Sequence, residues 1–451
     1  MTTGTLPGLY RIPAFRAVCH VRLTNKTPAA TYRSPGRYES TYVRERLMDA
    51  IAHELDMDPV ALRRRNLIPE NEMPFARELI VLGDPVEHDT GDYEAMLDKA
   101  LDKIGWDELQ ENLKTRRAAG ELVGAGISMF FEKSGLGPTD GARILVDPSG
   151  NIEVITGGAS VGQGFETVIA QICAHALGTD YRRIRVIHGQ TVRLDYGVGA
   201  HASRATVLTG SAVNATAVKV REMALEMAAE LLQTPAAILD IVDGTIQVPG
   251  NPSGPSVTLG EVAKALAPNS PTRGERDPFL SAEEWFHTDH QTYPYGLHMA
   301  VVRIDDGTGQ VYIERYFMAY DIGRAVNPML VEGQLVGGFA QGLGGALLEE
   351  FQFDGGGEPL SVTYADYLVP TLHDVPLPEI LLTEDAPSAK NPLGIKGAGE
   401  AGVTGAAAAI ASAIDAAIDV PGAVTQLPVT PQRLKKILLD NKVVSHGHPV
   451  R

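Results

Sequence analysis

The chain has 451 residues, of which 44% are hydrophobic and 21% are charged, so it contains ample material for a globular core. Its formal net charge of −17 argues against nucleic acid as a partner, because binding to phosphates needs clustered cations. The two cysteines, Cys19 and Cys173, lie far apart in the sequence, which excludes a disulfide scaffold, a zinc ribbon and an iron–sulfur cluster carried by this chain alone.

The first predicted lobe, residues 1–120, starts without the basic and apolar leader of a secreted protein. No run of about 18 apolar residues occurs in the chain, so we expect a cytoplasmic protein with no membrane span. Apolar residues recur with helical spacing over residues 38–67, where Pro59 should start a new turn. The charged residues of this segment predict a solvated helix face (Arg44, Glu45, Arg46, Arg63, Arg64 and Arg65). Residues 69–121 are predicted to be a polar connection with one helix near 93–104.

The second predicted lobe, residues 121–250, has the pattern of an α/β fold. Two strands, over residues 142–146 and 152–156, are joined by a turn that contains Pro148 and Gly150. A helix over residues 165–177, a strand over 184–188 and a long helix over 207–232 follow. Because strand, glycine-rich loop and helix recur, the sequence predicts a mixed α/β (α+β) fold in which glycine-rich loops lead into helices.

The third predicted lobe, residues 251–451, opens with a proline-rich and irregular stretch that spans residues 250–295. A hairpin over residues 299–304 and 311–320 precedes a helix over residues 331–349. This helix is rich in glycine, which costs about 1 kcal/mol per residue against alanine, so we expect it to pack closely against a neighbour or a ligand. An alanine-rich helix over residues 403–418 follows.

The loop over residues 394–402 sets a single carboxylate, Glu400, at the start of the alanine-rich helix. Glycine lacks a Cβ, so this loop lets the backbone approach a bulky ligand closely. The helix start adds free N–H groups and the positive end of the helix dipole. A lone acid in this setting can act as a general base on a molecule held against the loop, although an ordinary helix also favours an acid in its first turn.

The same loop matches the G-x-G-x-x-G pattern of dinucleotide-binding folds. That fingerprint needs a hydrophobic strand before the loop, and a second strand between the helix and an acidic residue about 20 positions on. Residues 388–393 do not form a strand pattern, and the helix runs straight into Asp419. The sequence therefore disfavours a nucleotide-binding dehydrogenase.

Four loops rich in glycine or polar residues occur before or within helices, at residues 157–164, 197–206, 337–345 and 394–402. Helix starts and clustered N–H groups bind anions, so four such loops predict a large ligand that carries phosphates. Side chains with suitable donors lie in or near them (Gln163, Ser203, Arg204, Thr206, Gln334 and Gln341). Each of these residues, taken alone, is better explained by a surface or capping role.

Several longer segments resemble one family, in the family's order. They are TYRSPGRYESTYVRERLMDAIAHELDMDPVALRRRNLI (31–68), GQGFETVIAQICAHALG (162–178), SRATVLTGSAV (203–213), DIGRAVNPMLVEGQLVGGFAQGLGGALLEE (321–350) and PLGIKGAGEAGVTGAAAAI (392–410). The chain resembles the second, C-terminal half of the molybdenum-binding large subunit in the xanthine dehydrogenase, aldehyde oxidase and carbon monoxide dehydrogenase family. The resemblance spans nearly the whole chain.

The resemblance implies a molybdenum centre carried by molybdopterin cytosine dinucleotide. It places that cofactor against the glycine-rich loops (Gly162, Gln163, Gly164, Ser203, Arg204, Thr206, Gln334, Gln341, Lys396, Gly397 and Gly399), with no metal ligand directly from the protein. Glu400 matches the catalytic glutamate of the family. In such enzymes this carboxylate takes a proton from water or hydroxide beside the metal, and the oxygen then attacks an electron-poor carbon.

The segment around Arg33 matches the loop that overhangs metal and substrate in the family. The resemblance gives Arg33 the role of orienting substrate and stabilising developing negative charge, with Ser34 and Pro35 in the substrate pocket. Ser34 stands where carbon monoxide dehydrogenases hold copper through a cysteine, so a copper site is not expected. Pro35 should stiffen this lip. His201 is a further pocket candidate, although a lone loop histidine is more often a surface residue.

The family's first molybdenum-binding half, with its GGGFG-type loop, is not found in this sequence. We therefore expect a partner chain that carries that half, and [2Fe–2S] and FAD subunits that take the electrons. The leading hypothesis is a molybdenum hydroxylase that oxidises an N-heterocycle or an aldehyde with oxygen derived from water. The alternative is a non-catalytic assembly subunit that braces the molybdenum site of another chain.

Overall fold

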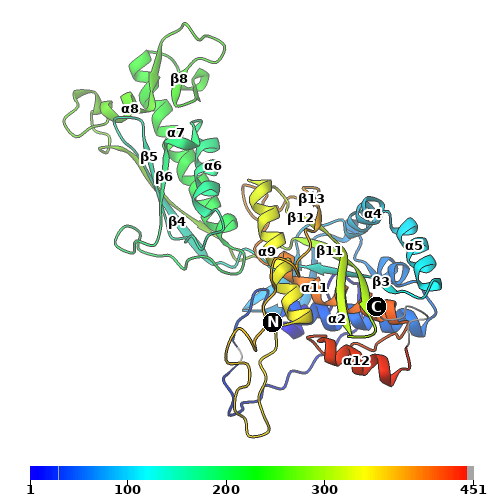
Figure 1. The fold of residues 1–451 in the computed structure, drawn as a ribbon. Helices are drawn as coiled ribbons and strands as arrows, with labels where there is room; N and C mark the ends of the chain where they lie inside the picture. The colour runs from blue at the N-terminus through cyan, green and yellow to red at the C-terminus, as the bar shows by residue number, and fades with distance from the viewer. Residues whose placement is uncertain (29, 444–451) are drawn as a thin grey trace.

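The computed structural model describes residues 1–28 and 30–443, which form a broad body and a smaller lobe that projects from it (Figure 1). Each part is built on its own four-stranded sheet. Helices pack on both sheets, and each sheet contains antiparallel pairs and one parallel pair. The mixed α/β class predicted from the sequence is confirmed.

The body sheet consists of β3 (Leu122–Phe131), β11 (Tyr295–Asp305), β12 (Gln310–Asp321) and β13 (Glu379–Thr383). Strand β11 lies between β3 and β12 and pairs with both in antiparallel register, while β13 runs parallel to β12 at the edge. Side chains that alternate along β3 and β11 enter two different hydrophobic cores. The sheet is therefore covered on both faces, and strands β3 and β11 are almost fully buried.

One core forms between the body sheet and α9 (Pro328–Leu347), α10 (Ala401–Thr404), α11 (Ala406–Ile418) and α12 (Pro431–Asp440). Helix α11 lies very close to β3, because a Cβ added at Gly124 or Gly126 would overlap backbone atoms of that helix. Gly338 of α9 meets the backbone of Gly402 in the same way. Glycines of α9 thus serve close helix packing, as the sequence predicted.

The second core lies on the other face of the body sheet and is built from the N-terminal region. Its elements are α2 (Arg37–Glu54), α3 (Pro59–Asn66), β1 (Phe75–Val81), β2 (Asp84–His88) and α4 (Tyr93–Ile104), with α1 (Thr2–Thr5) nearby and α5 (Trp106–Ala118) packed at the edge through Leu113. Strands β1 and β2 form an antiparallel hairpin. The predicted polar connection over residues 69–121 is therefore wrong in part, since it contains this hairpin and a second helix.

The charged residues of α2 and α3 include a buried network, so the predicted solvated face is wrong for this part. Glu45 is completely buried and accepts hydrogen bonds from Arg44 Nε (3.0 Å), Arg63 Nε (2.9 Å), the Tyr10 hydroxyl (3.0 Å) and the backbone N–H of Met129 (3.0 Å). A carboxylate with this many donors can be buried because its charge and its lone pairs are matched. The network ties α2 to strand β3.

The projecting lobe is built on β4 (Thr139–Val146), β5 (Ile152–Thr156), β6 (Ile184–Ile187) and β10 (Leu280–His287), in the order β10-β4-β5-β6. Helices α6 (Phe165–Leu177) and α7 (Gly210–Leu232) pack on this sheet, and a π-helical turn (Ala205–Thr209) leads into α7. The outer end carries α8 (Leu259–Ala265) and a small sheet of β7 (Asp240–Val242), β8 (Thr245–Gln247) and β9 (Ser256–Thr258).

Two strands show where the sequence patterns were insufficient. Strand β3 was missed because it is buried on both faces and carries glycines, so it lacks alternation. Strand β10 falls in the stretch over residues 250–295, so the prediction that this stretch is irregular is wrong. The strand was missed because its glutamates do not alternate regularly with its apolar residues. The predicted lobe boundaries near residues 120 and 250 stay a prediction. Two strand pairs, β3 with β11 and β10 with β4, join residues on opposite sides of the boundary near residue 250.

One stretch among the described residues, Ala401–Ile418, is long and apolar enough to cross a membrane by composition. It is 94% buried inside the protein, where α10 and α11 meet at Gly405. Burial of this kind identifies a core helix.

Replacing Gly126 with alanine tests the close packing of α11 on β3. The added Cβ would meet helix backbone, which cannot rotate away, so we expect the free energy of unfolding to fall by about 1–3 kcal/mol. Urea unfolding followed by circular dichroism measures this change. The matched control is Gly355→Ala, where an added Cβ meets nothing within 4 Å. Equal midpoints for both variants would contradict the packing argument.

Candidate active site

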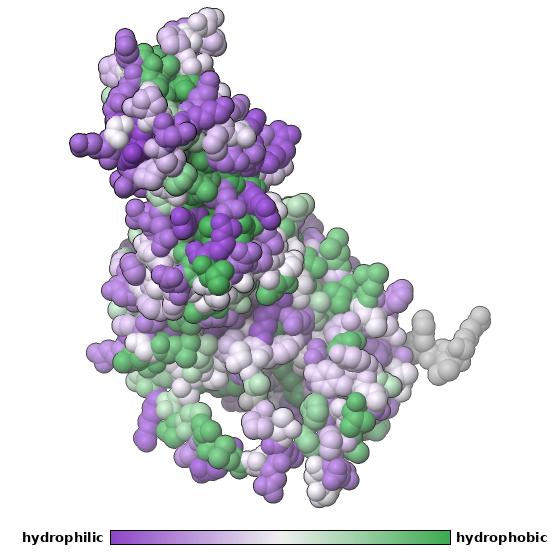
Figure 2. All heavy atoms as spheres, turned by 90° about the vertical axis from the view of Figure 1, so that its left-hand side faces the viewer, coloured by the Kyte–Doolittle hydropathy of each residue, from purple (hydrophilic) through white to green (hydrophobic). Residues whose placement is uncertain are grey.

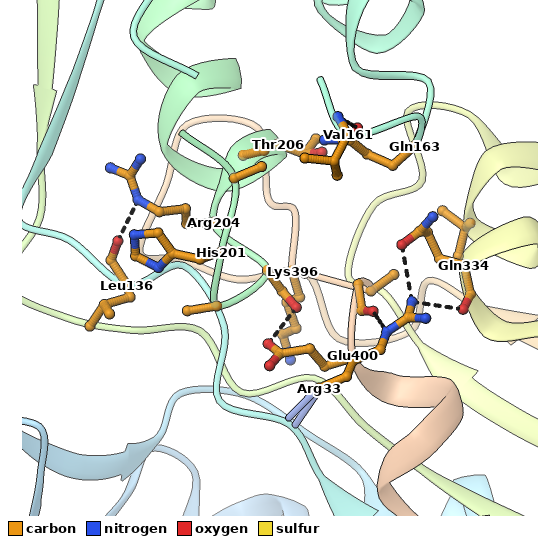
Figure 3. Close-up of a pocket in the computed structure, with 18 of the residues that line it drawn as sticks. Arg33, Leu136, Val161, Gln163, His201, Arg204, Thr206, Gln334, Lys396 and Glu400 are labelled. Carbon is orange, nitrogen blue, oxygen red and sulfur yellow. Dashed lines mark hydrogen bonds between the residues drawn. The ribbon is translucent and has the colours of Figure 1, made fainter. Parts of the chain in front are cut away.

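A cavity of about 1070 Å³ lies where the projecting lobe joins the body (Figure 3). All four of the predicted glycine-rich or polar loops contribute to its lining, through residues 161–163, 200–206, 337 and 395–400. Residues 31–33, Pro35 and the first half of α9 also line it. In Figure 3, Gln163 and Thr206 lie across the cavity from Glu400 and Arg33. The structure thus brings together loops that are far apart in the sequence.

Glu400 lies at the floor of this cavity and is 8% exposed. It is the residue before α10, yet its side chain does not cap that helix. Its Oε1 accepts hydrogen bonds from the backbone N–H of Ser34 (3.0 Å) and from Arg37 Nη2 (2.7 Å), while Oε2 accepts one from the Ser203 hydroxyl (2.9 Å). Oε1 is therefore the anchored oxygen, and Oε2 keeps capacity for another partner.

The backbone around Glu400 is held in uncommon conformations. Ser34 and Ser203 both have a positive φ, 62° and 48°, which costs free energy in residues that carry a Cβ. Each conformation directs a donor to the carboxylate, the N–H of Ser34 and the hydroxyl of Ser203. Gly397 lies against Ser203 with no room for a side chain, and a Cβ at Gly399 would make a tight contact with the Ser203 hydroxyl. Strain and close packing together hold the donors in place.

A second carboxylate, Glu132, lies behind Glu400 and is completely buried at the end of β3. Arg37 Nε is 2.8 Å from Glu132 Oε1, and the hydroxyl of Thr404 donates to Glu132 Oε2 (3.2 Å). Burial raises the pKa of Glu132 to about 8, against the opposing effect of Arg37. Neither Arg37 nor Glu132 was predicted from the sequence to be a site residue. The available signal was the position of Arg37 within the segment that carries Arg33.

Arg33 borders the cavity, as predicted, but its donors are occupied by the cavity wall. Its Nε donates to the carbonyl of Gly399 (2.6 Å), its Nη1 to Gln341 Oε1 (2.9 Å) and its Nη2 to the carbonyl and side chain of Gln334 (3.2 Å each). Burial lowers the pKa of Arg33, with Glu400 opposing the shift. The guanidinium therefore links the Glu400 loop to α9.

The predicted cofactor residues divide into two groups. Those that line the cavity are Gly162, Gln163, Ser203, Arg204, Thr206, Gln334, Lys396, Gly397 and Gly399, whereas Gly164 and Gln341 do not. The side chains of Arg204 and Lys396 are engaged within the protein. Arg204 donates to Asp140 Oδ2 (3.1 Å) and to backbone carbonyls, and Lys396 Nζ donates to the carbonyl of Thr90 (3.1 Å). These two side chains brace the loops.

The predicted pocket residues also fall into two groups. Pro35 and His201 line the cavity, while Ser34 is buried and reaches the site through its backbone N–H. Burial and the nearby Arg204 lower the pKa of His201 below its ordinary value. The imidazole is therefore neutral at neutral pH. Among the described residues there is no group of His, Cys, Asp or Glu side chains that could hold a metal ion.

Comparisons with known proteins place this geometry in a family. Residues 99–376 match the model of a molybdopterin cofactor-binding domain, and residues 1–67 match a second model of the same description. The chain belongs to the molybdopterin-binding family of the xanthine oxidase and carbon monoxide dehydrogenase type. This molybdopterin-binding chain has relatives that are molybdenum-dependent oxidoreductases, which confirms the resemblance found in the sequence.

Three relatives illustrate the similarity. The chain is 38% identical over 434 residues to the 6-hydroxypseudooxynicotine dehydrogenase complex subunit gamma of Paenarthrobacter nicotinovorans, with 96% of this chain and 54% of that protein covered. It is 32% identical to the carbon monoxide dehydrogenase large chain of Hydrogenophaga pseudoflava, with 97% and 55% covered. The structure of quinoline 2-oxidoreductase from Pseudomonas putida 86 matches with a TM-score of 0.87 at 31% identity, with 97% and 57% covered. The chain spans about half the length of the curated relatives it matches.

The residues present fit a molybdopterin cofactor. Gly162 (φ 94°) and Gly333 face open space, since a Cβ at either position would meet nothing within 4 Å, so backbone borders the cavity there. The volume exceeds that of an ordinary ligand pocket, about 300–1,000 Å³, which suits a large cofactor together with a substrate. The donors of Thr206 and the loop at residues 161–163 lie opposite Glu400, so a long ligand can span the cavity (Figure 3).

The raised pKa of Glu132 predicts a pH-dependent stability. Between its ordinary value of 4.5 and about 8, Glu132 holds a proton in the folded chain that the unfolded chain has released. Rising pH across this range should therefore lower the free energy of unfolding of the wild type relative to Glu132→Gln, by up to about 1.4 kcal/mol per pH unit. Urea unfolding of both proteins at several pH values measures the difference. Parallel stability curves would show that Glu132 is already ionised at neutral pH.

Proposed function

We propose that this chain provides the catalytic base and most of the pocket for a molybdenum-dependent hydroxylation of an electron-poor carbon, with N-heteroaromatic rings as the substrate class. The observation that carries the proposal is the carboxylate of Glu400, which faces a cofactor-sized cavity with Oε1 anchored and Oε2 less occupied. A base in that geometry can take a proton without moving.

Each residue of the site has its own role in the proposed reaction. When bound, the molybdenum cofactor would supply the two-electron oxidation of the substrate carbon. Glu400 takes the proton at Oε2, and Ser203 keeps that oxygen directed into the cavity. Arg37 compensates the charge of the carboxylate from behind.

Arg33 supports N-heteroaromatic rings as substrates. With its donors bound to Gly399, Gln334 and Gln341, the guanidinium offers its plane and charge to a substrate in place of free N–H groups. A guanidinium plane stacks well on an aromatic ring and stabilises negative charge that develops on it. The names of two relatives, 6-hydroxypseudooxynicotine dehydrogenase and quinoline 2-oxidoreductase, point to the same class. An aliphatic aldehyde offers no such ring.

The cofactor is proposed to be the cytosine dinucleotide form of molybdopterin, held by Gly162, Gln163, Ser203 and Thr206. Support comes from the cavity volume of about 1070 Å³ and from the position of these four residues in its lining. The electrons are proposed to leave through a [2Fe–2S] subunit and an FAD subunit. Cys19 is exposed and Cys173 is buried and alone, so the described residues contain no set of cysteines for a cluster.

A further partner is proposed to carry the remaining half of the family's large subunit. Two extended segments, residues 11–28 and 351–377, support this, since they project from the body as the blue and yellow traces at the bottom of Figure 1. They expose large apolar side chains (Val18, Val21, Leu23, Phe351, Leu360, Val362, Tyr364, Leu372 and Leu377). The hydrophobic colouring of the lower loops in Figure 2 shows the same feature. Such a patch needs a protein cover.

The proposed base is tested with Glu400→Gln in the assembled complex. Loss of the base should lower kcat for an N-heterocycle such as quinoline by about 10²-fold to 10⁴-fold, while molybdenum per complex stays unchanged. The matched control is Glu332→Gln, an exposed acid on α9 outside the cavity. Wild-type turnover by a metal-replete Glu400→Gln complex would contradict the assignment. A native complex without molybdenum would favour a non-catalytic assembly subunit.

The proposed partner surface is tested with the double variant Val21→Asp/Leu23→Asp. Both side chains are exposed, so this chain should keep its thermal midpoint while co-purification of the partner chain is lost. Leu439→Asp, at an exposed site on α12, is the control that should retain the partner. Retention of the partner by the double variant would contradict the proposed surface.

A further inference from the structure

Arg37 is shared by two carboxylates that come from distant parts of the chain. Its Nη2 donates to Glu400 Oε1 (2.7 Å), and its Nε lies 2.8 Å from Glu132 Oε1. Arg37 is 2% exposed and Glu132 is completely buried. Two negative charges and one positive charge on side chains that are this deeply buried would leave one charge uncompensated. The geometry therefore favours a state in which one carboxyl group is neutral.

The surroundings identify Glu132 as the neutral partner. Glu400 accepts three hydrogen bonds from donors and lies at the cavity, whereas Glu132 Oε2 faces only the hydroxyls of Ser34 (3.5 Å) and Thr404 (3.2 Å). A hydroxyl group can accept a hydrogen bond from a protonated carboxyl group as readily as it donates one to an ionised carboxylate. The raised pKa of Glu132, about 8, agrees with this assignment.

Other charged and titratable groups lie near Arg37, Glu132 and Glu400, but none of them takes over the role of Glu132. Arg33 lies at the cavity side and Tyr320, on β12, is buried with a pKa raised well above its ordinary value. Lys133, the next residue after Glu132, donates to the carbonyl of Val81 (2.6 Å), and burial lowers its pKa to about 8. Lys133 is therefore the one neighbour whose titration needs a control.

We propose that Arg37 and Glu132 are positioning residues for Glu400, and that the proton on Glu132 controls the charge of the group. With Glu132 neutral, the guanidinium serves Glu400 alone and holds its Oε1 in place. When Glu132 loses its proton, the guanidinium is divided between two carboxylates, and its hold on Glu400 Oε1 weakens. Arginine cannot release a proton, so Arg37 transmits charge and not protons between the two acids.

This inference rests on the proposed function, but its first test does not need turnover. Infrared spectra of the purified complex, recorded as pH is raised from about 6 to 9, should show the carbonyl stretch of a protonated carboxyl group disappear with a midpoint near 8. The band should be missing in Glu132→Gln and unchanged in Lys133→Gln. A band that persists in Glu132→Gln, or a wild type without one, would overturn the proposal even if the hydroxylase activity is confirmed.

The second test uses the pH profile of kcat/KM in the assembled complex. Glu132→Gln imitates the neutral acid, so its kcat/KM near pH 6.5 should stay within about threefold of the wild type while the alkaline limb of the profile is lost. Lys133→Gln should keep that limb. Arg37→Met should move the acid limb upward by about 1–3 pH units, and Arg37→Lys should restore part of the shift.

A purely structural role would change activity without moving either limb, and this result would overturn the proposal. A wild-type complex inactive on every N-heterocycle would instead count against the proposed function, and the infrared titration would still decide the assignment of Glu132. The two failures are therefore distinguishable.

Discussion

The arrangement of the site depends on one buried guanidinium. Arg37 opens α2, Glu132 follows β3 and Glu400 precedes α10, so the contacts of Arg37 with the two carboxyl groups join three elements that are far apart in the chain. Removing one partner from a buried group of charges costs several kcal/mol, because the remaining charge is left without compensation. The body core and the site are thus stabilised by the same contacts.

Close backbone packing makes this arrangement possible. Gly124 and Gly126 let α11 lie directly on β3, and Gly402 lets α10 reach α9. Because the helices come so near, the end of β3 and the start of α10 lie within reach of one arginine side chain. On the lobe side, Arg204 is bound to Asp140, which holds the strained loop that presents Ser203 to Glu400. Both parts of the molecule therefore fix the same carboxylate.

The sequence carried enough information for the fold class, most helices and the position of Glu400. Period and turn residues locate amphipathic helices well, and α4 and α6 have the predicted bounds. Features that depend on tertiary contacts could not be predicted from the sequence. Glu45 and Arg63 look like surface charges in the sequence because nothing local shows that they face each other in the core. Glu132 was missed for the same reason, since its partner is 95 residues away in the chain, at Arg37. The resemblance drew attention to the loop of Glu400, whereas the electrostatics behind that loop required the structure.

The central claim is that the chain forms the site of a molybdenum hydroxylase, in which oxygen from water is added to a ring carbon. Turnover of quinoline by the native complex in water labelled with heavy oxygen, followed by mass spectrometry of the product, tests this most directly. We expect the oxygen added to the ring to carry the label, and we expect Glu400→Gln to form almost none of this product. A product whose oxygen comes from molecular oxygen, or one formed equally by Glu400→Gln, would contradict it.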